Sequence, residues 1–479
     1  MFFNSIDFAI FLPIVFFLYW LVTNKYLKLQ NLLIVIASYV FYGCWDYRFL
    51  ALILFSTIVD FSVGKMLISI DNNKKRRLLL WVSIAVNIGL LGFFKYYNFF
   101  VDNFVSAFQF FGQSISPNTL HIILPVGISF YTFQTLSYTI DVYNKKLKPT
   151  SNFIAFAAFV SFFPQLVAGP IERATHLLPQ FYKKRTFNYN NAIDGMRQIL
   201  WGLFKKVVIA DNCAEYVNVI FNSYGDQTGS TLILGAFFFA FQIYGDFSGY
   251  SDIAIGTSRL FGFDLMKNFA FPYFSRDIAE FWRRWHISLS TWFRDYLYIP
   301  LGGSKGNKKL KIRNIFIIFL VSGFWHGANW TFIIWGALNA IYFLPLMLTN
   351  KNRNNLDIVA QNQWLPSFKE LLNIMITFML TLLAWIFFRS DTVSDALSYI
   401  INIFNSSLFT VPQLSENTKT TLVLILFFIG IEWIGRRDAF AISKIGKLPI
   451  YIRWMFYFIL IILMFIYTGK EQAFIYFQF

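Results

Sequence analysis

Charged residues and cysteines are both scarce in this chain of 479 residues. Only 14% of the residues are Asp, Glu, Lys or Arg, and the two cysteines are Cys44 and Cys213. Neither cysteine belongs to a CxxC pair, so the sequence predicts neither a disulfide framework nor a zinc site. An HExxH motif and a Cys/His cluster are also missing, and we therefore expect no metal site.

Other absences bear on the domain organisation. The sequence has no internal repeat, no low-complexity tract and no polar stretch longer than Thr349 to Ser367. It also lacks a GxSxG motif, so a soluble esterase-like domain is not expected within the chain. We predict one domain over residues 1–479, with a main core at 1–348, an inter-helix loop at 349–369 and C-terminal helices at 370–479.

Apolar residues dominate the remaining composition. Hydrophobic residues make up 57% of the chain, which includes 61 phenylalanines, and the mean hydropathy is +0.52. Soluble domains are roughly 45–50% apolar. Apolar runs long enough for a spanning helix recur along the chain, whereas membrane β-strands would be short and alternating. The sequence therefore predicts an all-α, multi-pass integral membrane protein.

Candidate spans follow from the positions of these runs. The first run, Phe8 to Val22, follows Asp7 and has no small-residue cleavage site, so we expect a retained helix. Residues 231–261 are too many for one straight span, and 312–348 contain a break at His326, so tilted, interrupted or re-entrant segments are expected. The expected spans are 8–23, 30–44, 49–69, 78–97, 120–142, 153–169, 194–211, 231–261, 312–324, 328–348, 370–388, 420–435 and 452–469.

The net charge of +16 indicates orientation rather than nucleic-acid binding. Basic residues form short clusters between apolar runs, as the positive-inside bias predicts, so the expected surroundings are membrane lipids and no nucleic acid. Loops that contain Lys25 and Lys28, Lys74 to Arg77, and Arg436 with Arg437 should face the cytoplasm. Both termini and the final peptide, residues 474–479, would then face outward.

Two histidines lie within apolar sequence that carries other ionisable groups. His286 ends the run Phe-Trp-Arg-Arg-Trp-His from Phe281, and His326 lies in Phe-Trp-His-Gly from Phe324. A charge at the bilayer centre costs roughly 2.5–3.5 kcal/mol on insertion scales, so such residues are functional-site candidates. The alternative is a neutral histidine hydrogen-bonded between helices.

A stretch at residues 240–262 combines small residues with two carboxylates. Gly245, Gly249 and Gly256 share a helical face, and small residues at this spacing let membrane helices pack closely. Asp246 and Asp252 should be paired if buried, and the expected partners are Arg259, Arg276, Arg283 or Arg284.

The next segment, Ile278 to Tyr298, mixes arginines with tryptophans and suits a helix at or partly within the membrane interface. The Gly- and Lys-rich loop at 301–309 lacks the spacing of a nucleotide P-loop, and we interpret it as a cytoplasmic topology signal.

Four ordered motifs carry a family resemblance. They are Phe163–Ile171 (FPQLVAGPI), Asp246–Asp252 (DFSGYSD), Phe281–Tyr298 and Trp325–Trp330 (WHGANW). Together they resemble the membrane-bound O-acyltransferase superfamily, in the bacterial branch of alginate O-acetylases and peptidoglycan O-acetyltransferases. The teichoic acid D-alanyl transfer proteins are more distantly similar. The resemblance runs from about residue 1 to 345 and continues more weakly beyond.

The resemblance implies a helical bundle crossed by a central tunnel, with catalysis in the core at 1–348. His326 corresponds to the family's catalytic histidine and His286 to its second characteristic polar position, whereas His121 and His176 match neither. The chain departs from the alginate branch at Asn339-Ala340, where a further His-Gly often follows, and this argues against alginate as the acceptor.

The residues support acyl transfer chemistry at these positions. A neutral imidazole can take the proton of a hydroxyl that attacks a thioester, and hydrogen-bond donors must stabilise the oxyanion. We expect His326 to be the base, and the candidate donors are Trp325, Asn329, Trp330 and His286. Arg283 and Arg284 are expected to bind an anionic donor, and Asp246 is a further candidate for substrate binding.

By resemblance, the chain takes acetyl from acetyl-CoA, binds no permanent cofactor and acts in a bacterial cytoplasmic membrane. The acceptor would be an envelope polysaccharide, either peptidoglycan or an exopolysaccharide. An extracytoplasmic esterase-like partner of the SGNH type would complete the transfer. Transfer of D-alanyl or another acyl group stays an alternative. A polysaccharide export channel is the alternative of another class, although no inverted repeat supports it.

The final apolar peptide contains Tyr476 and resembles the C-terminal tyrosine motif of acyl carriers in related systems. By that resemblance, Tyr476 would accept the acyl group and pass it to the outer partner. A phenolate is a good nucleophile and a good leaving group, but an unperturbed Tyr has a pKa near 10 and needs an adjacent base. The alternative is an aromatic residue at the membrane interface.

Overall fold

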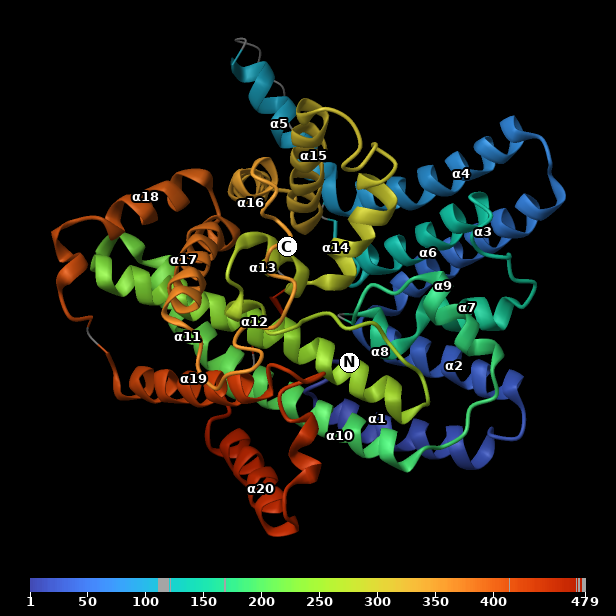
Figure 1. Cartoon of the computed structure of the whole chain (residues 1–479). Helices are drawn as coiled ribbons and strands as arrows, with labels where there is room; N and C mark the ends of the chain where they lie inside the picture. Colours follow the sequence, from blue (N-terminus) through green and yellow to red (C-terminus); the bar gives the residue numbers. More distant parts are fainter. Residues whose placement is uncertain are drawn as a thin grey trace. The chain divides into compact units, whose positions relative to one another are not determined.

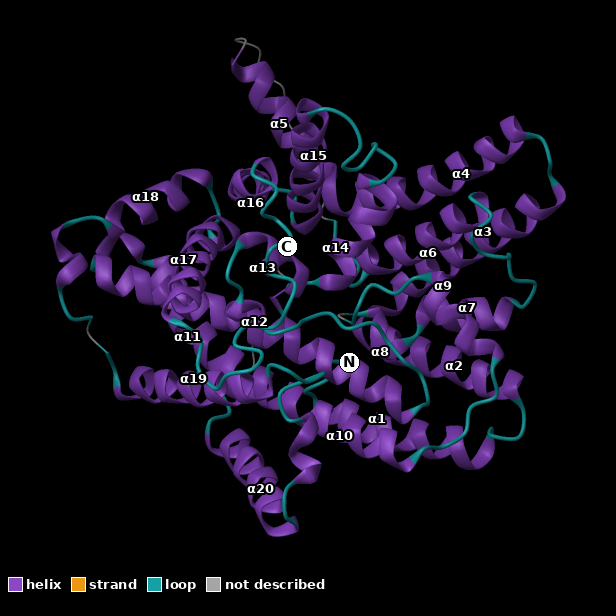
Figure 2. Cartoon of the chain, viewed as in Figure 1, coloured by secondary structure: helices purple, strands orange, loops and turns teal. Residues whose placement is uncertain are grey.

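The chain is described by a computed structural model that covers residues 1–110, 120, 122–167, 169–412, 414–470, 472 and 474–475. These residues form helices joined by loops, and no strand occurs among them (Figure 2). The prediction of an all-α protein is therefore confirmed.

Two compact units make up the chain. One consists of Met1–Ala192 with Thr257–Met266, and the other of Ile193–Gly256 with Lys267–Phe479. The predicted division of the chain at residues 349–369 does not coincide with a boundary between these two units, and it stays a prediction.

The first unit is built mainly from helices of the N-terminal part of the chain (Figure 1). Helix α3 packs against α4, α6 and α7, and α2 packs against α7. The helices are α1 (Ile6–Phe17), α2 (Leu27–Asp46), α3 (Leu50–Ser69), α4 (Asn73–Leu91), α5 (Tyr97–Phe110), α6 (Ile128–Tyr143), α7 (Phe153–Ser161), α8 (Phe163–Leu166) and α9 (Ala174–Leu177).

A buried carboxylate lies among these helices. Asp60 of α3 accepts hydrogen bonds from Asn87 Nδ2 at 2.8 Å and from Thr139 Oγ1 at 3.0 Å, and Ser83 Oγ also donates to it. Buried carboxylates need such donors because water is absent. Asp60 is therefore held by neutral donors of α4 and α6.

The second unit contains most of α10 and α12 and all later helices (Figure 1). Helix α15 packs along α16, α16 packs against α17, and α17 packs against α18. The helices are α10 (Tyr189–Phe204), α11 (Asp211–Asn222), α12 (Gly229–Leu260), α13 (Ile278–Arg284), α14 (Ile287–Phe293), α15 (Lys308–His326), α16 (Trp330–Leu348), α17 (Phe368–Arg389), α18 (Val393–Ile403), α19 (Glu416–Gly435) and α20 (Ile450–Ile466).

Six helical stretches among the described residues are long and apolar enough to cross a membrane. They are Leu27–Ser69, Asn73–Phe110, Gly229–Leu260, Trp330–Leu348, Phe368–Arg389 and Glu416–Gly435. Four shorter apolar helical stretches, Ile6–Val22, Phe153–Leu166, Val393–Ile403 and Ile450–Ile466, accompany them. A multi-pass membrane protein is thus confirmed, although several predicted bounds are wrong: α6 begins at Ile128, not at residue 120.

Helix α12 is one continuous helix of 32 residues, so of the tilted, interrupted or re-entrant forms expected in the middle of the chain, an interruption does not occur in α12. The predicted close-packing face is present. A methyl group added at Gly249 would lie 2.8 Å from the carbonyl oxygen of Gly202 in α10, and one at Gly256 would lie 2.5 Å from that of Gly195. These contacts are shorter than a side chain allows, so the glycines let α10 and α12 approach. The break at His326 is confirmed, since α15 ends there and α16 begins at Trp330.

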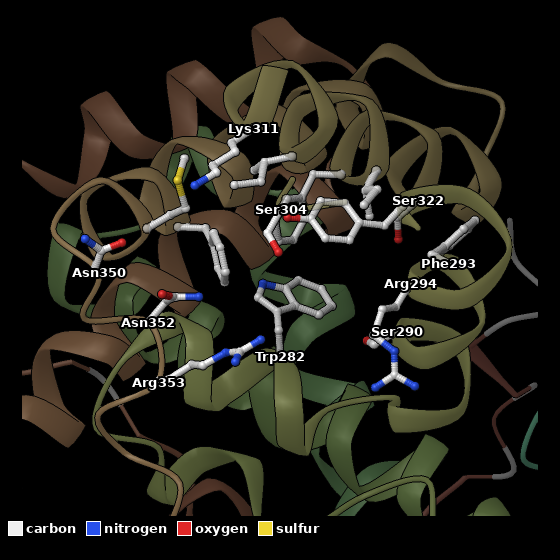
Figure 3. A pocket seen from close by; sticks show the side chains of 16 residues that line it. Trp282, Ser290, Phe293, Arg294, Ser304, Lys311, Ser322, Asn350, Asn352 and Arg353 are labelled. Carbon is white, nitrogen blue, oxygen red and sulfur yellow. The ribbon is translucent and has the colours of Figure 1, made fainter. Parts of the chain in front are cut away.

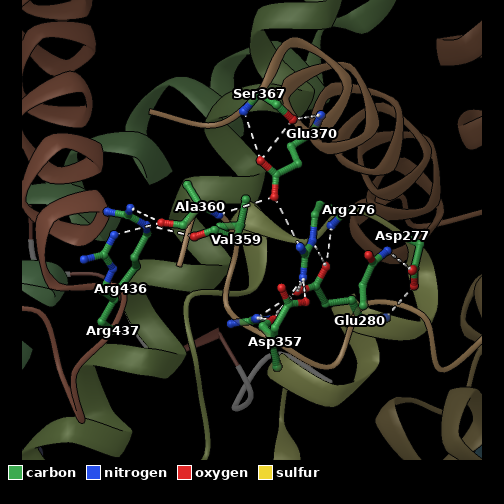
Figure 4. Close-up of polar contacts among 12 residues, drawn as sticks. Arg276, Asp277, Glu280, Asp357, Val359, Ala360, Ser367, Glu370, Arg436 and Arg437 are labelled. Carbon is green, nitrogen blue, oxygen red and sulfur yellow. Dashed lines mark hydrogen bonds and ion pairs between the residues drawn. The ribbon is translucent and has the colours of Figure 1, made fainter. Parts of the chain in front are cut away.

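The polar stretch from Thr349 to Ser367 is the loop between α16 and α17, as predicted. Buried arginines hold it in place (Figure 4). Arg276 contacts Glu280 at 3.1 Å, Asp357 at 2.9 Å and Glu370 at 3.3 Å. Arg436 donates to the Val359 and Ala360 carbonyl oxygens at 3.1 and 2.9 Å. This loop is therefore fixed by charge-assisted hydrogen bonds, which are stronger than neutral ones.

Candidate active site

The hairpin of α15 and α16 places His326. A methyl group at Gly323 would lie 2.2 Å from the Phe332 carbonyl oxygen, and one at Gly336 would lie 2.3 Å from that of Phe319, so the two helices are in backbone contact. His326 is the last residue of α15, and its side chain is buried. The rigid, close-packed hairpin therefore fixes the imidazole at its turn.

His286 lies at the junction between α13 and α14. Its backbone is left-handed, with φ of +43°, at the position that precedes the first residue of α14. A residue other than Gly in this region costs roughly 1–3 kcal/mol, and such residues concentrate at functional sites. The imidazole is buried, and its Nδ1 lies 3.0 Å from Oδ1 of Asn268.

The hydrogen bonds of Asn268 decide the tautomer of His286. The backbone N–H of Ser288 points to Asn268 Oδ1 at 3.4 Å, and the Ser288 hydroxyl donates to it at 2.8 Å. Asn268 Nδ2 donates to Ser251 Oγ at 3.0 Å. Because a backbone N–H can only donate, this side-chain atom is the oxygen, and His286 Nδ1 must carry a proton. The neutral ring then presents Nε2 as a hydrogen-bond acceptor and base.

Aromatic side chains surround both histidines. The His286 and His326 ring centroids are 6.5 Å apart, and the Trp325 ring lies 6.1 and 4.9 Å from them. The neighbours of His326 are Trp335 at 5.1 Å and Phe388 at 5.3 Å, and Phe247 lies 4.6 Å from His286. The structure thus brings together the two histidines predicted from the sequence, in buried and aromatic surroundings.

Burial lowers the pKa of His286, which lies outside the candidate spans, to about 3. The ordinary value is near 6.5, so His286 is neutral at physiological pH. A neutral His286 with its proton on Nδ1 accepts at Nε2, and the expected use of His286 as an oxyanion donor stays a prediction. Trp325, whose indole can only donate, is the candidate donor next to both rings.

A basic pocket of about 500 Å³ is lined by Trp282 and by Ser322, which precedes His326 by four positions in α15. Figure 3 shows the Lys311 and Arg353 side chains around the indole of Trp282, and Arg294 lines the same pocket. The ring centroids of Trp282 and Trp335 are 5.6 Å apart, and those of Trp335 and His326 are 5.1 Å apart. One aromatic ring therefore separates a wall of the pocket from His326.

The expected donor-binding arginines have other contacts. Arg283 donates to the Asn352 and Asn355 carbonyl oxygens, both at 2.8 Å. Arg284 pairs with Glu280 at 2.7 Å. These contacts favour a role in anchoring the loop between α16 and α17. The cations that line the pocket are Arg294, Lys311 and Arg353, none of which was a candidate site residue from the sequence.

The remaining predicted site residues are dispersed. Asn329 caps α16 by accepting from the Thr331 N–H at 3.1 Å, and Trp330 is half exposed. Asp246 is buried and contacts Lys206 at 2.9 Å, so its partner is this lysine and none of the arginines expected from the sequence. Asp252 likewise pairs with Lys205, at 2.5 Å.

The predicted Tyr476 and the two histidines that match no family position lie elsewhere. Tyr476 and His121 fall outside the described residues. His176 belongs to the first unit, where its Nδ1 contacts Glu172 at 2.8 Å.

Comparison with known proteins gives a consistent result. The family model of the membrane-bound O-acyltransferases matches residues 145–387, a range that includes both histidines. The probable alginate O-acetylase AlgI of Pseudomonas aeruginosa is 39% identical over 440 residues, 91% of this chain and 81% of the relative. The peptidoglycan O-acetyltransferase of Helicobacter pylori is 37% identical over 419 residues, 81% of this chain and 77% of the relative. The teichoic acid D-alanyltransferase of Bacillus subtilis is 29% identical over 269 residues, 54% of this chain and 67% of the relative.

Proposed function

The chain belongs to the membrane-bound O-acyltransferase family, and on that premise we propose that it passes acetyl groups from cytoplasmic acetyl-CoA to an envelope polysaccharide. It is a multi-pass membrane acyltransferase. Relatives named for O-acetylation of alginate and of peptidoglycan support acetyl as the group and a glycan as the final acceptor. A bacterial cytoplasmic membrane is the proposed location, because the donor is made inside the cell and the polymer lies outside.

The observation that carries the proposal is the buried pair of His326 and His286. Their ring centroids are 6.5 Å apart, which lets both imidazoles reach one small acyl group. His326 takes the proton of the attacking hydroxyl as the C–O bond forms, and the C–S bond of the thioester breaks. The proton then passes to the departing thiolate of CoA. General-base catalysis of this kind contributes roughly 10²–10⁴-fold to the rate.

The basic pocket supports an anionic donor. Arg294, Lys311 and Arg353 supply positive charge in this pocket. Its lining residue Trp282 packs against Trp335, which in turn packs against His326. Arginine and lysine side chains bind phosphate groups, which acetyl-CoA carries. We expect Lys311→Gln to raise the KM for acetyl-CoA with little change in kcat. Lys309→Gln is the matched control, since it changes a cation of the same helix that does not line the pocket.

The deciding experiment uses purified full-length protein in lipid nanodiscs with labelled acetyl-CoA. We expect acetyl transfer or hydrolysis that falls by at least about 10²-fold in His326→Ala and less in His286→Ala. Insertion and expression should be normal in both variants. No turnover of acetyl-CoA by the wild-type protein, with turnover of a D-alanyl donor instead, would replace this proposal by the second candidate, which the D-alanyltransferase relatives favour.

The route to the polysaccharide is proposed to use Tyr476 and an extracytoplasmic SGNH-type partner. The phenol of Tyr476 would attack the thioester, and its ester would then be the acyl donor for the partner. Tyr476→Phe removes one oxygen and keeps the ring, and Tyr451→Phe, at an exposed position of α20, is the control. We expect envelope O-acetylation to be lost only in Tyr476→Phe. Unchanged O-acetylation, with no acetyl-tyrosine in the C-terminal peptide by mass spectrometry, would exclude the relay.

A further inference from the structure

Beyond α20, main-chain atoms of four described residues of the C-terminal segment, Tyr467, Lys470, Gln472 and Ile475, are bound by side chains of other elements. Asn212 Nδ2 of α11 donates to the Tyr467 carbonyl oxygen at 2.8 Å. Glu215, one turn further along α11, accepts from the Lys470 N–H at 3.1 Å. A methyl group at Gly469 would lie 3.1 Å from the Asp211 carbonyl carbon, so the segment lies directly against the start of α11.

Two buried charges continue this pattern. Lys206 Nζ donates to the Gln472 carbonyl oxygen at 3.0 Å. Asp246 Oδ2 of α12 accepts from the Ile475 N–H at 2.6 Å. All four contacts therefore go to main-chain atoms of residues 467–475, which makes them independent of the side chains of that segment.

The charges of this site form a buried triad. Lys206 Nζ lies 2.8 Å from Asp211 and 2.9 Å from Asp246, and the three side chains are 1%, 5% and 3% exposed. One lysine therefore faces two carboxylates, and the Ile475 N–H donates to one of them, Asp246. Burying three ionised groups is costly unless each is satisfied, so packing a chain end would not by itself select them.

One apolar side chain of this segment, Phe474, packs against aromatic residues near His286. Phe474 is buried, and its ring lies 4.4 Å from Tyr250 and 6.0 Å from Phe247. Phe247 is the ring that lies 4.6 Å from His286. The bound segment and His286 therefore share one aromatic neighbour.

From these contacts we propose that Lys206, Asn212, Glu215 and Asp246 form a main-chain clamp for the C-terminal segment. The clamp fixes the segment up to Ile475 and so sets the point from which the last four residues, beginning with Tyr476, continue. Its four members are positioning residues, and Asp211 holds Lys206 in place. The consequence for acyl transfer rests on the proposed function, whereas the binding of the segment does not.

The first test measures amide hydrogen exchange of the full-length protein in nanodiscs. Asp246→Asn and Lys206→Met should speed exchange at Lys470 and Ile475 by at least about tenfold, because local opening sets the protection. Asp252→Asn and Lys205→Met are the control variants, because they change the neighbouring buried pair, which does not contact the described part of the segment. They should leave exchange at Lys470 and Ile475 unchanged. Equal exchange in the two sets of variants would overturn the clamp.

The second test separates the contribution of the Ile475 main-chain N–H from that of the Ile475 side chain. Ile475→Pro removes the N–H that Asp246 accepts, whereas Ile475→Val keeps it. We expect Ile475→Pro to lose acetylation of the C-terminal peptide while acetyl-CoA hydrolysis and its KM persist, and Ile475→Val to behave as the wild type. Full peptide acetylation in Ile475→Pro would overturn the positioning role. If the wild-type protein does not turn over acetyl-CoA, the proposed function fails, but the exchange experiment still decides whether the clamp exists.

Discussion

A single amide at Asn268 controls how His286 can react. The Asn268 oxygen holds the His286 proton on Nδ1, so Nε2 is free to act as a base only in the neutral ring. Sequence reasoning found both histidines from their tryptophan-rich context, but it missed Asn268. No motif spacing joins a loop asparagine to a histidine that lies 18 positions later. Their contact depends on the left-handed backbone at His286, which residue type does not predict.

A substitution at Asn268 should therefore alter the pH dependence of catalysis. In Asn268→Asp a carboxylate would face His286, and an opposite charge raises the pKa of a histidine. Turnover should then fall as the pH is lowered from about 8 to 5.5, because His286 becomes protonated, whereas the wild type should show no such loss from this residue. The measurement is the pH profile of acetyl-CoA turnover. Asn314→Asp, at another buried asparagine of the same unit, serves as the control and should not introduce the acid limb.

A different histidine should govern stability in the alkaline range. The carboxylates of Asp264, at 3.8 Å, and of Glu172, hydrogen-bonded at 2.8 Å, raise the pKa of His176 in the first unit to about 10. Its unfolded value is near 6.5, so its stabilising contribution is complete below pH 6.5 and is lost as the pH rises towards 10. The melting temperature of the wild type should exceed that of His176→Gln most at pH 6, and the difference should shrink by pH 10. A difference that grows with pH would contradict the ion pair.

At the scale of helices, the glycine face of α12 determines how closely it approaches α10. Gly249→Ala would place a methyl group 2.8 Å from the Gly202 carbonyl oxygen, and backbone cannot yield as a flexible side chain can. We expect a loss of about 1–3 kcal/mol, as for other overpacked sites. Thermal unfolding in detergent measures it. Gly89→Ala in α4 is the matched control because its added methyl group meets nothing within 4 Å, so it should be neutral or stabilising.

Helix positions were predictable where composition alone decides them. The close-packing glycines and the break after His326 were foreseen, because small residues and a Gly-Ala-Asn turn have local physical meaning. The start of α6 and the continuity of α12 were not. An apolar run such as 120–127 predicts a membrane helix from composition alone, whatever its backbone conformation is. Helix α12 can be longer than one straight span because other parts of the protein, rather than lipid, cover most of its surface.

For the whole molecule, the distribution of positive charge predicts the orientation in the membrane. In a cysteine-free background, Cys44→Ser with Cys213→Ser, a cysteine introduced at Lys75 or Lys444 should react with an impermeant thiol reagent only after the membrane is opened. A cysteine at Glu416, at the opposite end of α19 from Arg436, should react in intact cells. Labelling of the Lys75 and Lys444 positions in intact cells, with protection of the Glu416 position, would reverse the assigned topology and place the C-terminal peptide inside.

The two lysine–aspartate pairs of α12 also constrain how the protein is made. Lys205 and Lys206 leave the ribosome before Asp246 and Asp252, and Lys205 precedes its partner by 47 positions. Each unpaired charge would cost about 2.5–3.5 kcal/mol on entry into the bilayer. The cost is avoided if the lysine-bearing segment and α12 enter together, with the lysines and aspartates already paired. The translocon should therefore retain the earlier segment until α12 arrives and release both together. A variant that lacks one member of a pair would then be inserted in lower yield than the wild type, although the protein that does insert can still be purified and measured.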